Sequence, residues 1–399
     1  MKDRIKENIR KFSQGRAFYI ILFCMLGLLA AASLFAGIRN GARYSQDFQY
    51  DAAKALSSGV DPYDVSLSGK RSPKVPGLGD YYAYYEGVGA PQRMEANQFP
   101  SLLYLLLPYT FFDAHTARIL WLISNLVFTA VTVMLLRVTF LKDMDRRFFA
   151  VCMLLMIAGL PWRNQIGVGQ HTLFSVAFFL LAVYLSVEKD RPGPAALALC
   201  ISYFKYTLTV PLAVYFVYRR KWKELVLSIP LHVAGTAAAA LILHESFFDM
   251  IIKPLKVAAA LSSSGSMDVG ALMGGGILSV AVTALILIFL TVLALFCPPD
   301  QDRLLMSVLV LWGLIMTYHR LYDYFVLIIL FGYFAVKEER LSGIFCLLTV
   351  CAVFFIPRIF NESAVSVVIT GIIYYAFTLY MTLEALKTVK EQRAGGDNG

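Results

Sequence analysis

Residues 17–38, AFYIILFCMLGLLAAASLFAGI, form an unbroken run of 22 residues without a charged side chain. A helix of that length, rising ~1.5 Å per residue, is long enough to cross the hydrocarbon core of a bilayer, which is ~30 Å thick. Because the run is longer than the apolar part of a signal peptide and lacks a small-residue cleavage site, we expect it to be retained. Hydrophobic residues make up 58% of the 399-residue chain and charged residues only 16%. Soluble domains are about 45–50% apolar and about 25% charged, so the sequence predicts an all-α polytopic protein of a lipid bilayer.

The cysteines and the net charge argue against other classes of protein. The six cysteines lie in or beside apolar segments and include no C-x-x-C pair, which predicts small hydrophobic side chains rather than a disulfide or zinc framework. The basic residues behind the net charge of +9 cluster in short loops between apolar segments, as topology signals do, so we predict no nucleic-acid partner. No H-E-x-x-H or G-x-x-x-x-G-K-[ST] pattern occurs, and we predict neither a metal nor a cofactor.

Short basic segments alternate with the apolar ones and predict the topology. They are residues 2–16, 137–147, 187–192, 218–224, 299–303, 336–340 and 386–393. If all of them are cytoplasmic, the chain has about 12 membrane segments and both of its ends inside. The predicted regions are a cytoplasmic N-terminus (1–17), one transmembrane domain (18–386) and a cytoplasmic tail (387–399). The outer face then carries one long loop, residues 38–116, with short or re-entrant helices.

One apolar stretch, residues 193–217, does not fit this topology as a single span. A single span there would place one of its two basic flanks outside, whereas two half-helices that meet at Lys205 keep both flanks inside. We therefore predict a helical hairpin that carries Lys205 toward the outer face. A lysine within an apolar segment costs roughly 2.5–3.5 kcal/mol on insertion scales, which favours a functional cation for a phosphate over simple snorkelling to the interface. The segment FPSLLYLLLPYTFF (99–112) carries two prolines, and we expect a re-entrant or interfacial helix.

Acidic residues follow the first apolar segment, in YSQDFQYDAAKALSSGVDPYD (44–64). The stretch YDAAKALSSG (50–59) predicts a short amphipathic helix that ends at Gly59, and we expect Asp51 to cap its N-terminus, with catalysis as the alternative. Asp61 belongs to a DPYD turn. Asp47 has no such local role, and a carboxylate that is partly desolvated at the membrane boundary can act as a general base. We therefore predict Asp47 as the catalytic residue, with Tyr44 beside it in the substrate site.

Two further outer turns collect polar residues. In GLPWRNQIGVGQHT (159–172), Arg163 and the N–H groups at the start of the next helix can hold an anion, and Gln170 and His171 mark that start; the alternative is an ordinary interhelical loop. In MTYHRLYDYFVLIIL (316–330), His319, Arg320, Tyr322 and Asp323 predict a phosphate- or sugar-binding cluster. Alternatively, His319 and Asp323 simply pair across a helix start. The four tyrosines of GDYYAYYEG (79–87) offer aromatic faces to sugar rings, although interfacial tyrosines are common.

Five motifs in this order resemble the family 87 glycosyltransferases, membrane enzymes of the GT-C superfamily. They are DFQYDAAKALSSGVDPYD, FPSLLYLLLPYTFF, GQHTLFSVAFFLLAVYL, SYFKYTLTVPLAVYFVYRRKW and YHRLYDYFVLIIL, within roughly residues 20–340. The double proline usual at the start of the second motif is here Phe99-Pro100-Ser101. The family includes polyprenol-phosphate-mannose-dependent α-1,2-mannosyltransferases. The resemblance implies a GT-C-type bundle that transfers a sugar from a lipid phosphate to a glycan or glycolipid of the cell envelope, on the outer face of a bacterial cytoplasmic membrane.

The resemblance also suggests roles for individual residues. Asp47 matches the first-loop aspartate regarded as the base in such enzymes, while Gln170 matches a Gly-Gln position of unassigned role. The predicted donor-phosphate site comprises Lys205, His319, Arg320 and Arg163. The predicted substrate site comprises Gln170, His171, Tyr322, Asp323, Asp51 and Tyr44. The rivals are a polysaccharide or lipid-linked sugar transporter or flippase and an enzyme like the O-antigen ligases; the chain shows no convincing internal repeat of the transporter kind.

Overall fold

The computed structural model describes residues 16–69, 75–261, 267–274, 276–335, 340–360 and 363–396. Its regular elements within these ranges are all helical, which confirms the predicted all-α class. The predicted cytoplasmic N-terminus lies almost wholly outside the described residues, as does most of the basic loop 336–340.

Long apolar helices dominate the described part of the chain. Seven of them can cross a membrane by length and composition: Tyr19–Arg43, Ala114–Val138, Pro192–Tyr218, Trp222–Leu243, Gly276–Phe296, Ser342–Ile359 and Ala364–Ala394. An eighth candidate is the pair α9 (Arg146–Ala158) and α10 (Leu160–Val168), which bends by 53° between the two helices. A multi-pass membrane protein with 7–8 candidate spans is therefore shown. The predicted total of about 12 segments would also require the shorter apolar helices and stays a prediction.

The bundle has a buried centre and a lipid-like periphery. The central elements are α11 (Thr172–Val183) with a π-helical turn (Tyr184–Glu188), α13 (Tyr206–Tyr218), α19 (Asp302–Met316), the 3₁₀ helix η4 (Leu321–Leu330) and α20 (Phe331–Phe334). The peripheral elements are α2 (Arg16–Arg43), α8 (Ala114–Val138), α14 (Trp222–Leu227), α15 (Pro230–Leu243), α18 (Gly276–Phe296), α21 (Arg340–Ile359) and α22 (Ala364–Gly396). The central helices are apolar on all sides because protein surrounds them. By contrast, α18 exposes large apolar side chains such as Ile277 and Val280, as a lipid-facing helix does.

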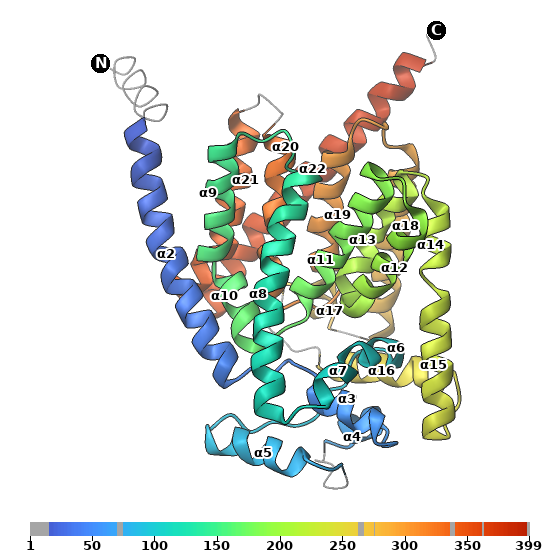
Figure 1. Cartoon of the computed structure of the whole chain (residues 1–399). Helices are drawn as coiled ribbons and strands as arrows, with labels where there is room; N and C mark the ends of the chain where they lie inside the picture. Colours follow the sequence, from blue (N-terminus) through green and yellow to red (C-terminus); the bar gives the residue numbers. More distant parts are fainter. Residues whose placement is uncertain are drawn as a thin grey trace.

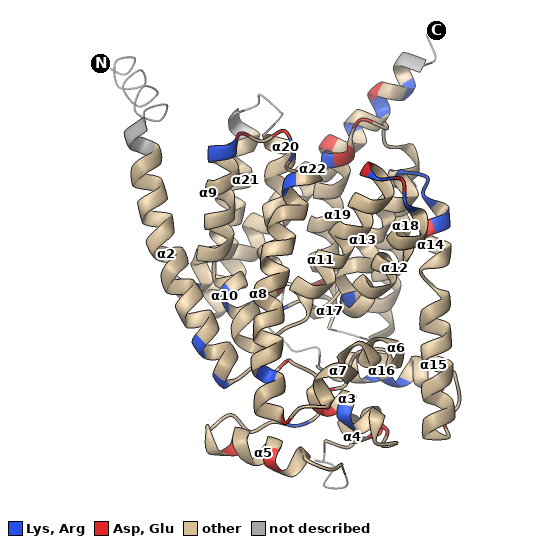
Figure 2. Ribbon diagram, in the orientation of Figure 1, with Lys and Arg blue, Asp and Glu red and all other residues tan. Residues whose placement is uncertain are grey.

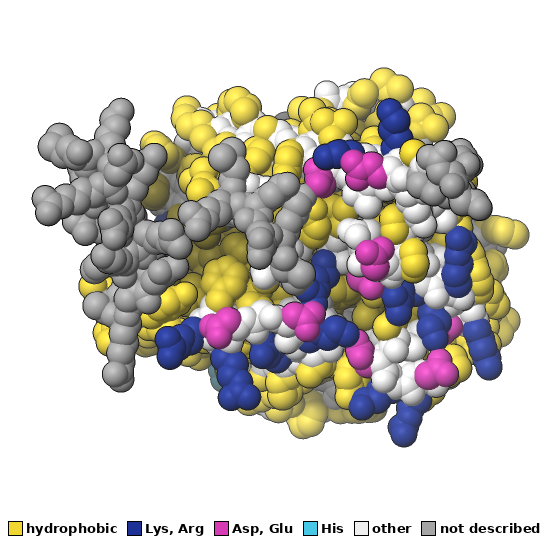
Figure 3. Space-filling model, turned by 90° about the horizontal axis from the view of Figure 1, so that it is seen from above, with side chains coloured by type: hydrophobic (Ala, Val, Ile, Leu, Met, Phe, Trp, Pro, Cys, Tyr) yellow, Lys and Arg dark blue, Asp and Glu magenta, His cyan; other side chains and the backbone are white. Residues whose placement is uncertain are grey.

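The two ends of the bundle differ in charge and structure. Helix α2 begins and α22 ends on the same side, at the top of Figure 1. Lysines and arginines gather there in the interhelical loops (Figure 2), and the view onto that end shows them interspersed with acids (Figure 3). Ion pairs tie these loops together, among them Lys142 to Glu188 at 2.9 Å and Arg219 to Asp302 at 3.2 Å. This arrangement fits the predicted grouping of the described basic loops on one side.

The stretch around Lys205 folds back on itself. Helix α12 (Pro192–Ser202) leads into a 3₁₀ turn, Tyr203–Lys205, and α13 follows. A continuous helix from 192 to 218 would separate its ends by ~40 Å. Instead, Lys221 pairs with Asp190 at 3.0 Å, and Ser186 donates a hydrogen bond to Glu224 at 2.5 Å, so both ends lie together. The predicted hairpin, with Lys205 at its turn, is confirmed, and Pro192–Tyr218 is therefore a candidate span by length and composition only.

Short helices cover the opposite end, at the bottom of Figure 1. They are α3 (Tyr50–Ser57), α4 (Pro62–Ser68), α5 (Leu78–Gly87), α6 (Pro100–Leu103), a 3₁₀ turn (Tyr104–Leu106), α7 (Leu107–Thr110) and α16 (Asp249–Leu261), whereas the short α17 (Val269–Leu272) packs against α18 and α19. They share a separate aromatic-rich core that includes Tyr50, Tyr63 and Tyr85. The long loop thus carries short helices, as predicted, and the 99–112 segment forms broken short helices rather than a span.

Two local predictions in this region were wrong. Asp51 does not cap α3, because the helix starts at Tyr50 and Gln49, two residues before Asp51, occupies the cap position. Residues 61–64 form no simple turn. Instead, Asp61 caps α4, its carboxylate accepting from the N–H groups of Tyr63 and Asp64, and Pro62 fits the first helical position, where its missing N–H costs nothing.

Candidate active site

Asp47 lies in the loop that joins α2 to α3, at the inner edge of the short-helix region. Its N–H donates to the carbonyl of Val168 at 2.8 Å, which ties the loop to the end of α10. The neighbouring Gly169 has a φ of +67°, and a Cβ there would lie 2.9 Å from the Ser45 side chain. Glycine is therefore required both for the backbone conformation and for the close approach of the two loops. The indole of Trp121 donates to the Gly169 carbonyl at 2.7 Å and completes the junction.

Gln170 connects Asp47 to the last polar turn. Its side-chain amide nitrogen donates to the Asp47 carboxylate at 3.2 Å and to the Tyr322 hydroxyl at 2.9 Å. Its amide oxygen accepts from the His171 N–H at 2.8 Å, so the orientation of the amide is defined by its partners. The Gln170 side chain is buried. Both amide protons are committed, and the Asp47 carboxylate is thereby fixed in direction.

Lys205 lies on the other side of Tyr322. Its ammonium group is 3.4 Å from the Asp323 carboxylate and 5.6 Å from the centre of the Tyr322 ring. Asp323 is fully buried and also accepts a hydrogen bond from the Thr172 hydroxyl. The carboxylate holds the lysine in place, and the lysine offsets the cost of burying the carboxylate.

These residues meet around one cavity of about 110 Å³. Its polar lining includes the Asp47 carboxylate, Gln170, Tyr322, and the side chains of Lys205 and Arg320. The Arg320 Nε donates to the Tyr318 hydroxyl at 2.6 Å, which directs the guanidinium. Three carboxylates (Asp47, Asp51 and Glu95) and three cations (Arg93, Lys205 and Arg320) therefore line the same space, at the junction of the bundle and the short helices.

Burial shifts the pKa values of two acids of the cavity, Asp47 and Asp51, in the same direction. Burial raises the pKa of Asp47 to about 6, although the charges of Arg320 and Lys205 and the Tyr322 hydroxyl oppose the rise. Burial likewise raises the pKa of Asp51 to about 7, opposed by hydrogen bonds from the Ala52 N–H and the Tyr82 hydroxyl. A base with a pKa just below neutral is ionised at pH 7 and still binds a proton well, which suits general base catalysis.

A family model for glycosyltransferase family 87 matches residues 100–319, more than half of the chain. The chain belongs to glycosyltransferase family 87. No curated protein and no solved structure matches it. Membership makes the protein a membrane glycosyltransferase, with a sugar donor and an acceptor as its substrates. Gln170 and Lys205 lie within the matched region, whereas Asp47 and Asp323 lie outside it.

The glycosyltransferase does not use every predicted residue at this cavity. Asp47, Asp51, Gln170, Lys205, Arg320 and Tyr322 line it. Asp323 lies behind Lys205, His171 packs at 4.5 Å on the Phe204 ring, and the His319 ring contacts the Thr317 carbonyl at 3.0 Å. These three side chains are buried and support the lining. Arg163 and Tyr44 do not line the cavity; Arg163 bonds to Asn164, and the Tyr44 carbonyl accepts from Tyr85.

Sequence reasoning missed one wall of the cavity. The segment before α6 contributes Arg93, Glu95, Asn97 and Gln98 to the lining. The Gln49 side chain donates to Asn97 Oδ1 at 2.5 Å and to the Glu95 carbonyl at 3.2 Å, which joins this segment to the loop of Asp47. The available signal was the polar run QRMEANQ immediately before an apolar segment.

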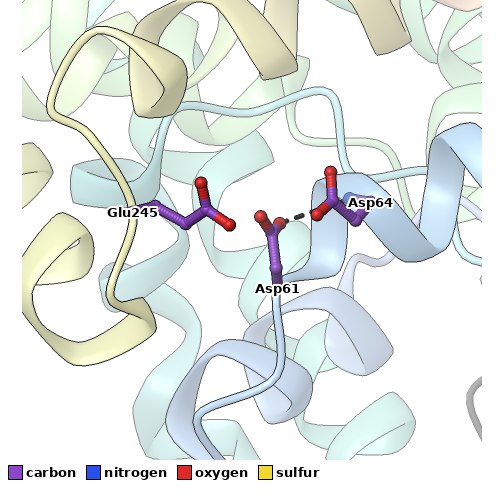
Figure 4. Close-up of side chains that lie close together, drawn as sticks. All are labelled: Asp61, Asp64 and Glu245. Atoms are coloured by element: carbon purple, nitrogen blue, oxygen red, sulfur yellow. Dashed lines mark hydrogen bonds between the residues drawn. The ribbon is translucent and has the colours of Figure 1, made fainter.

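A second group of acids lies in the short-helix region, where α4 meets the segment that leads into α16. Oxygens of Asp61, Asp64 and Glu245 lie within 4.8 Å of one another, a spacing that fits a metal ion (Figure 4). The Lys253 ammonium lies among them, at 2.6, 3.0 and 3.3 Å from the three carboxylates. Lysine thus supplies the positive charge at this position and clamps α16 to α4.

Proposed function

We propose that this glycosyltransferase moves mannose from a polyprenyl-phosphate donor to a glycan or glycolipid acceptor on the outer face of the membrane, with inversion at the anomeric carbon. One observation carries the proposal: the fixed Asp47 carboxylate and the cations Lys205 and Arg320 border one cavity. A base for a hydroxyl and positive charge for a phosphate are the two requirements of such a transfer.

In the proposed step, Asp47 removes the proton from an acceptor hydroxyl. The oxygen attacks the anomeric carbon of the donor sugar as the bond from that carbon to the phosphate oxygen breaks. The proton remains on Asp47, and the bonding electrons leave with the polyprenyl phosphate. A single displacement of this kind inverts the anomeric configuration.

The leaving group gains negative charge as it departs. Lys205 and Arg320 would neutralise that charge, since positive groups placed in advance stabilise the transition state without reorganisation. Asp323 neutralises Lys205 only in part, because their closest approach is 3.4 Å and the ammonium still borders the cavity. Gln170 would keep the Asp47 carboxylate directed at the acceptor.

The outer-face location rests on charge and chemistry together. The cavity lies toward the end of the bundle opposite the basic interhelical loops of α8–α9 and α13–α14, and those loops favour the cytoplasm. With both chain ends inside, the topology has about 12 membrane segments. Nucleotide sugars are cytoplasmic, so an outer-face enzyme needs a donor that the bilayer can deliver. A lipid phosphate meets that need.

The deciding experiment supplies radiolabelled polyprenyl-phosphate-mannose to membranes that contain the wild type, Asp47→Asn or Asp249→Asn. Asp249 is an exposed carboxylate in the same region that does not line the cavity, so it controls for the substitution itself. We expect transfer by the wild type and Asp249→Asn, and a loss of about 10²–10⁴-fold in Asp47→Asn. Wild-type inactivity with this donor would refute the mannose assignment, and full activity of Asp47→Asn would transfer the role of base to Asp51, which also lines the cavity.

A further inference from the structure

A second cavity lies beside the catalytic one, on the other face of the chain that leads into α3. Gln49 and Asp51 line the catalytic cavity, whereas the intervening Tyr50, with Lys54, lines the second. This second cavity has a volume of about 540 Å³ and is formed by α3, the start of α5, the end of the α7 segment and the start of α8. We call it the aromatic cleft. Its other lining residues are Gly77, Asp80, Tyr81, Tyr84, Phe111, Phe112, Asp113, Ala114, His115 and Arg118.

Aromatic rings form much of the cleft. Phe111 is 87% exposed and Phe112 is 45% exposed, at the end of the α7 segment. Tyr50 is held by its hydroxyl, which donates to the Phe112 carbonyl at 2.9 Å, and Tyr84 by its hydroxyl, which donates to the Arg43 carbonyl at 2.8 Å. The tyrosine rings are therefore fixed before any ligand arrives, and the phenylalanine rings present open faces.

Polar groups of opposite type border these rings. Arg118 is only 4% exposed, and its guanidinium lies 4.1 Å from the centre of the Tyr84 ring. Its Nη2 is bonded to His115 Nδ1 at 3.0 Å, whereas its buried Nε has no hydrogen-bond partner and no ion pair joins the guanidinium to a described carboxylate. Asp80 is exposed at the start of α5, and its carboxylate makes no contact with another described polar group. The cleft thus offers a fixed donor and a free acceptor beside aromatic faces.

We propose that the aromatic cleft binds the sugar units of the acceptor that lie away from the reacting hydroxyl. A sugar ring has C–H groups that pack on an aromatic face and hydroxyl pairs at its edge that bond to a carboxylate or a guanidinium. The ligand class is a neutral oligosaccharide, because the two acids of the cleft, Asp80 and Asp113, offset the charges of Lys54 and Arg118. This inference rests on the proposed transfer to a glycan acceptor and makes the enzyme selective for acceptors several sugars long.

Binding of α-mannotetraose and of α-arabinofuranotetraose to the full-length protein in lipid nanodiscs, measured by calorimetry, tests the proposal directly. The variants are Asp80→Asn and Tyr84→Leu, with Tyr84→Phe as the conservative partner. Glu86→Gln serves as the matched control, since this exposed carboxylate is also on α5 but does not line the cleft. Asp47→Asn shows whether tetrasaccharide binding depends on the catalytic cavity.

We expect at least one tetrasaccharide to bind, and Asp80→Asn and Tyr84→Leu to weaken it about tenfold. The affinity of Tyr84→Phe, Glu86→Gln and Asp47→Asn for the tetrasaccharide should stay within about twofold of the wild-type affinity, because these variants retain the aromatic ring at position 84 and the Asp80 carboxylate. In transfer assays, the KM for a tetrasaccharide acceptor should rise about tenfold in Asp80→Asn, with kcat and the KM for a monosaccharide glycoside unchanged.

Binding of neither tetrasaccharide, or equal binding by wild type, Asp80→Asn and Tyr84→Leu, would overturn the cleft as a glycan site. Because calorimetry needs no donor, the two proposals fail separately. If the tetrasaccharide binds but no sugar is transferred, the proposed reaction is wrong. If sugar is transferred but the tetrasaccharide does not bind, the cleft is not a glycan site.

Discussion

Lys205 and Lys253 are two lysines of nearly equal burial with opposite surroundings. Their side chains are 13% and 14% exposed, and both ammonium groups lie near carboxylates. Lys253 has three carboxylates within 3.3 Å, two of them at 3.0 Å or less. Lys205 has one, at 3.4 Å, and a cavity on its open side.

The difference separates a structural cation from one that is available to a ligand. Around Lys253 the negative charges outnumber the positive one, so an added phosphate would be repelled, and the contact joins α16 to α4. Around Lys205 only Asp323 lies within ion-pair distance among the described residues, and the other acids of the cavity, Asp47, Asp51 and Glu95, are matched in number by Arg93 and Arg320 together with Lys205. Burial and ion pairing by themselves do not mark a functional lysine; the count of its partners and the adjoining space do.

The largest expected effect comes from removing the two lysines in turn. Lys205→Met should lower the transfer rate about 10²–10³-fold, because the departing phosphate loses its nearest fixed charge. Lys253→Met should leave the rate per folded molecule within about threefold. Initial rates, normalised to the folded fraction from size-exclusion profiles, give the comparison. Equal losses in both variants would remove the distinction between the two lysines.

A double variant separates catalysis from folding at Lys205. Lys205→Met alone leaves Asp323 buried without its cation, which costs stability. Lys205→Met with Asp323→Asn should recover the thermal stability but not the activity. Recovery of activity in the double variant would show that Lys205 only compensates Asp323.

The contacts of Lys253 with its three carboxylates predict that its removal lowers stability rather than activity. Lys253→Met should destabilise the protein by about 2–3 kcal/mol, less than a fully buried broken pair, because Asp64 and Glu245 are partly exposed and regain solvent. Thermal unfolding of the detergent-solubilised protein measures the change. Lys253→Met combined with the amides at Asp61, Asp64 and Glu245 should recover part of the lost stability. No recovery would contradict a structural role for these ion pairs.

Substitution of Gln170 tests whether its hydrogen bond controls the pKa and the orientation of the Asp47 carboxylate. With a pKa of about 6, Asp47 is protonated below that pH, so the transfer rate should fall about tenfold per pH unit there and level off above pH 7. Gln170→Leu removes a donor that favours the ionised form, so the pKa should rise and the profile move upward by about one unit, with a plateau lowered about tenfold. A lower plateau with an unshifted profile would assign Gln170 to binding rather than to Asp47.

The smallest effect is a gain in stability when the base is removed. Because the folded-state pKa of Asp47 is raised, its ionisation costs folding free energy that is absent below about pH 4 and complete above about pH 6. Asp47→Asn should therefore stabilise the protein by about 1–2 kcal/mol at pH 7.5 and by much less at pH 4.5. This figure is smaller than the full pKa shift would give, because solvent in the cavity screens the charge of Asp47. Unfolding temperatures at the two pH values check the sign; destabilisation at pH 7.5 would mean that the carboxylate is structural.

Much of the fold followed from local patterns. Residues 17–38 predicted a span from apolar length alone, and α2 occupies that region. The hairpin at Lys205 followed from two basic flanks that could not lie on opposite sides. Asp47 stood out because no cap or turn explained it. By contrast, the cap assigned to Asp51 was wrong because the cap position lies two residues earlier, at Gln49, and the residue pattern does not mark it.

The sequence by itself determined which segments are apolar, which loops are basic and which polar residues lack a local explanation, because these depend on short-range composition and spacing. Only the tertiary structure decided that Asp47, Gln170, Lys205 and Arg320 share one cavity, since they are separated by up to 273 positions and meet through loop packing at Gly169. The tertiary structure alone also distinguished Lys253 from Lys205. The partners of a charge come from distant segments, and their number decides whether that charge is neutralised or left for a substrate.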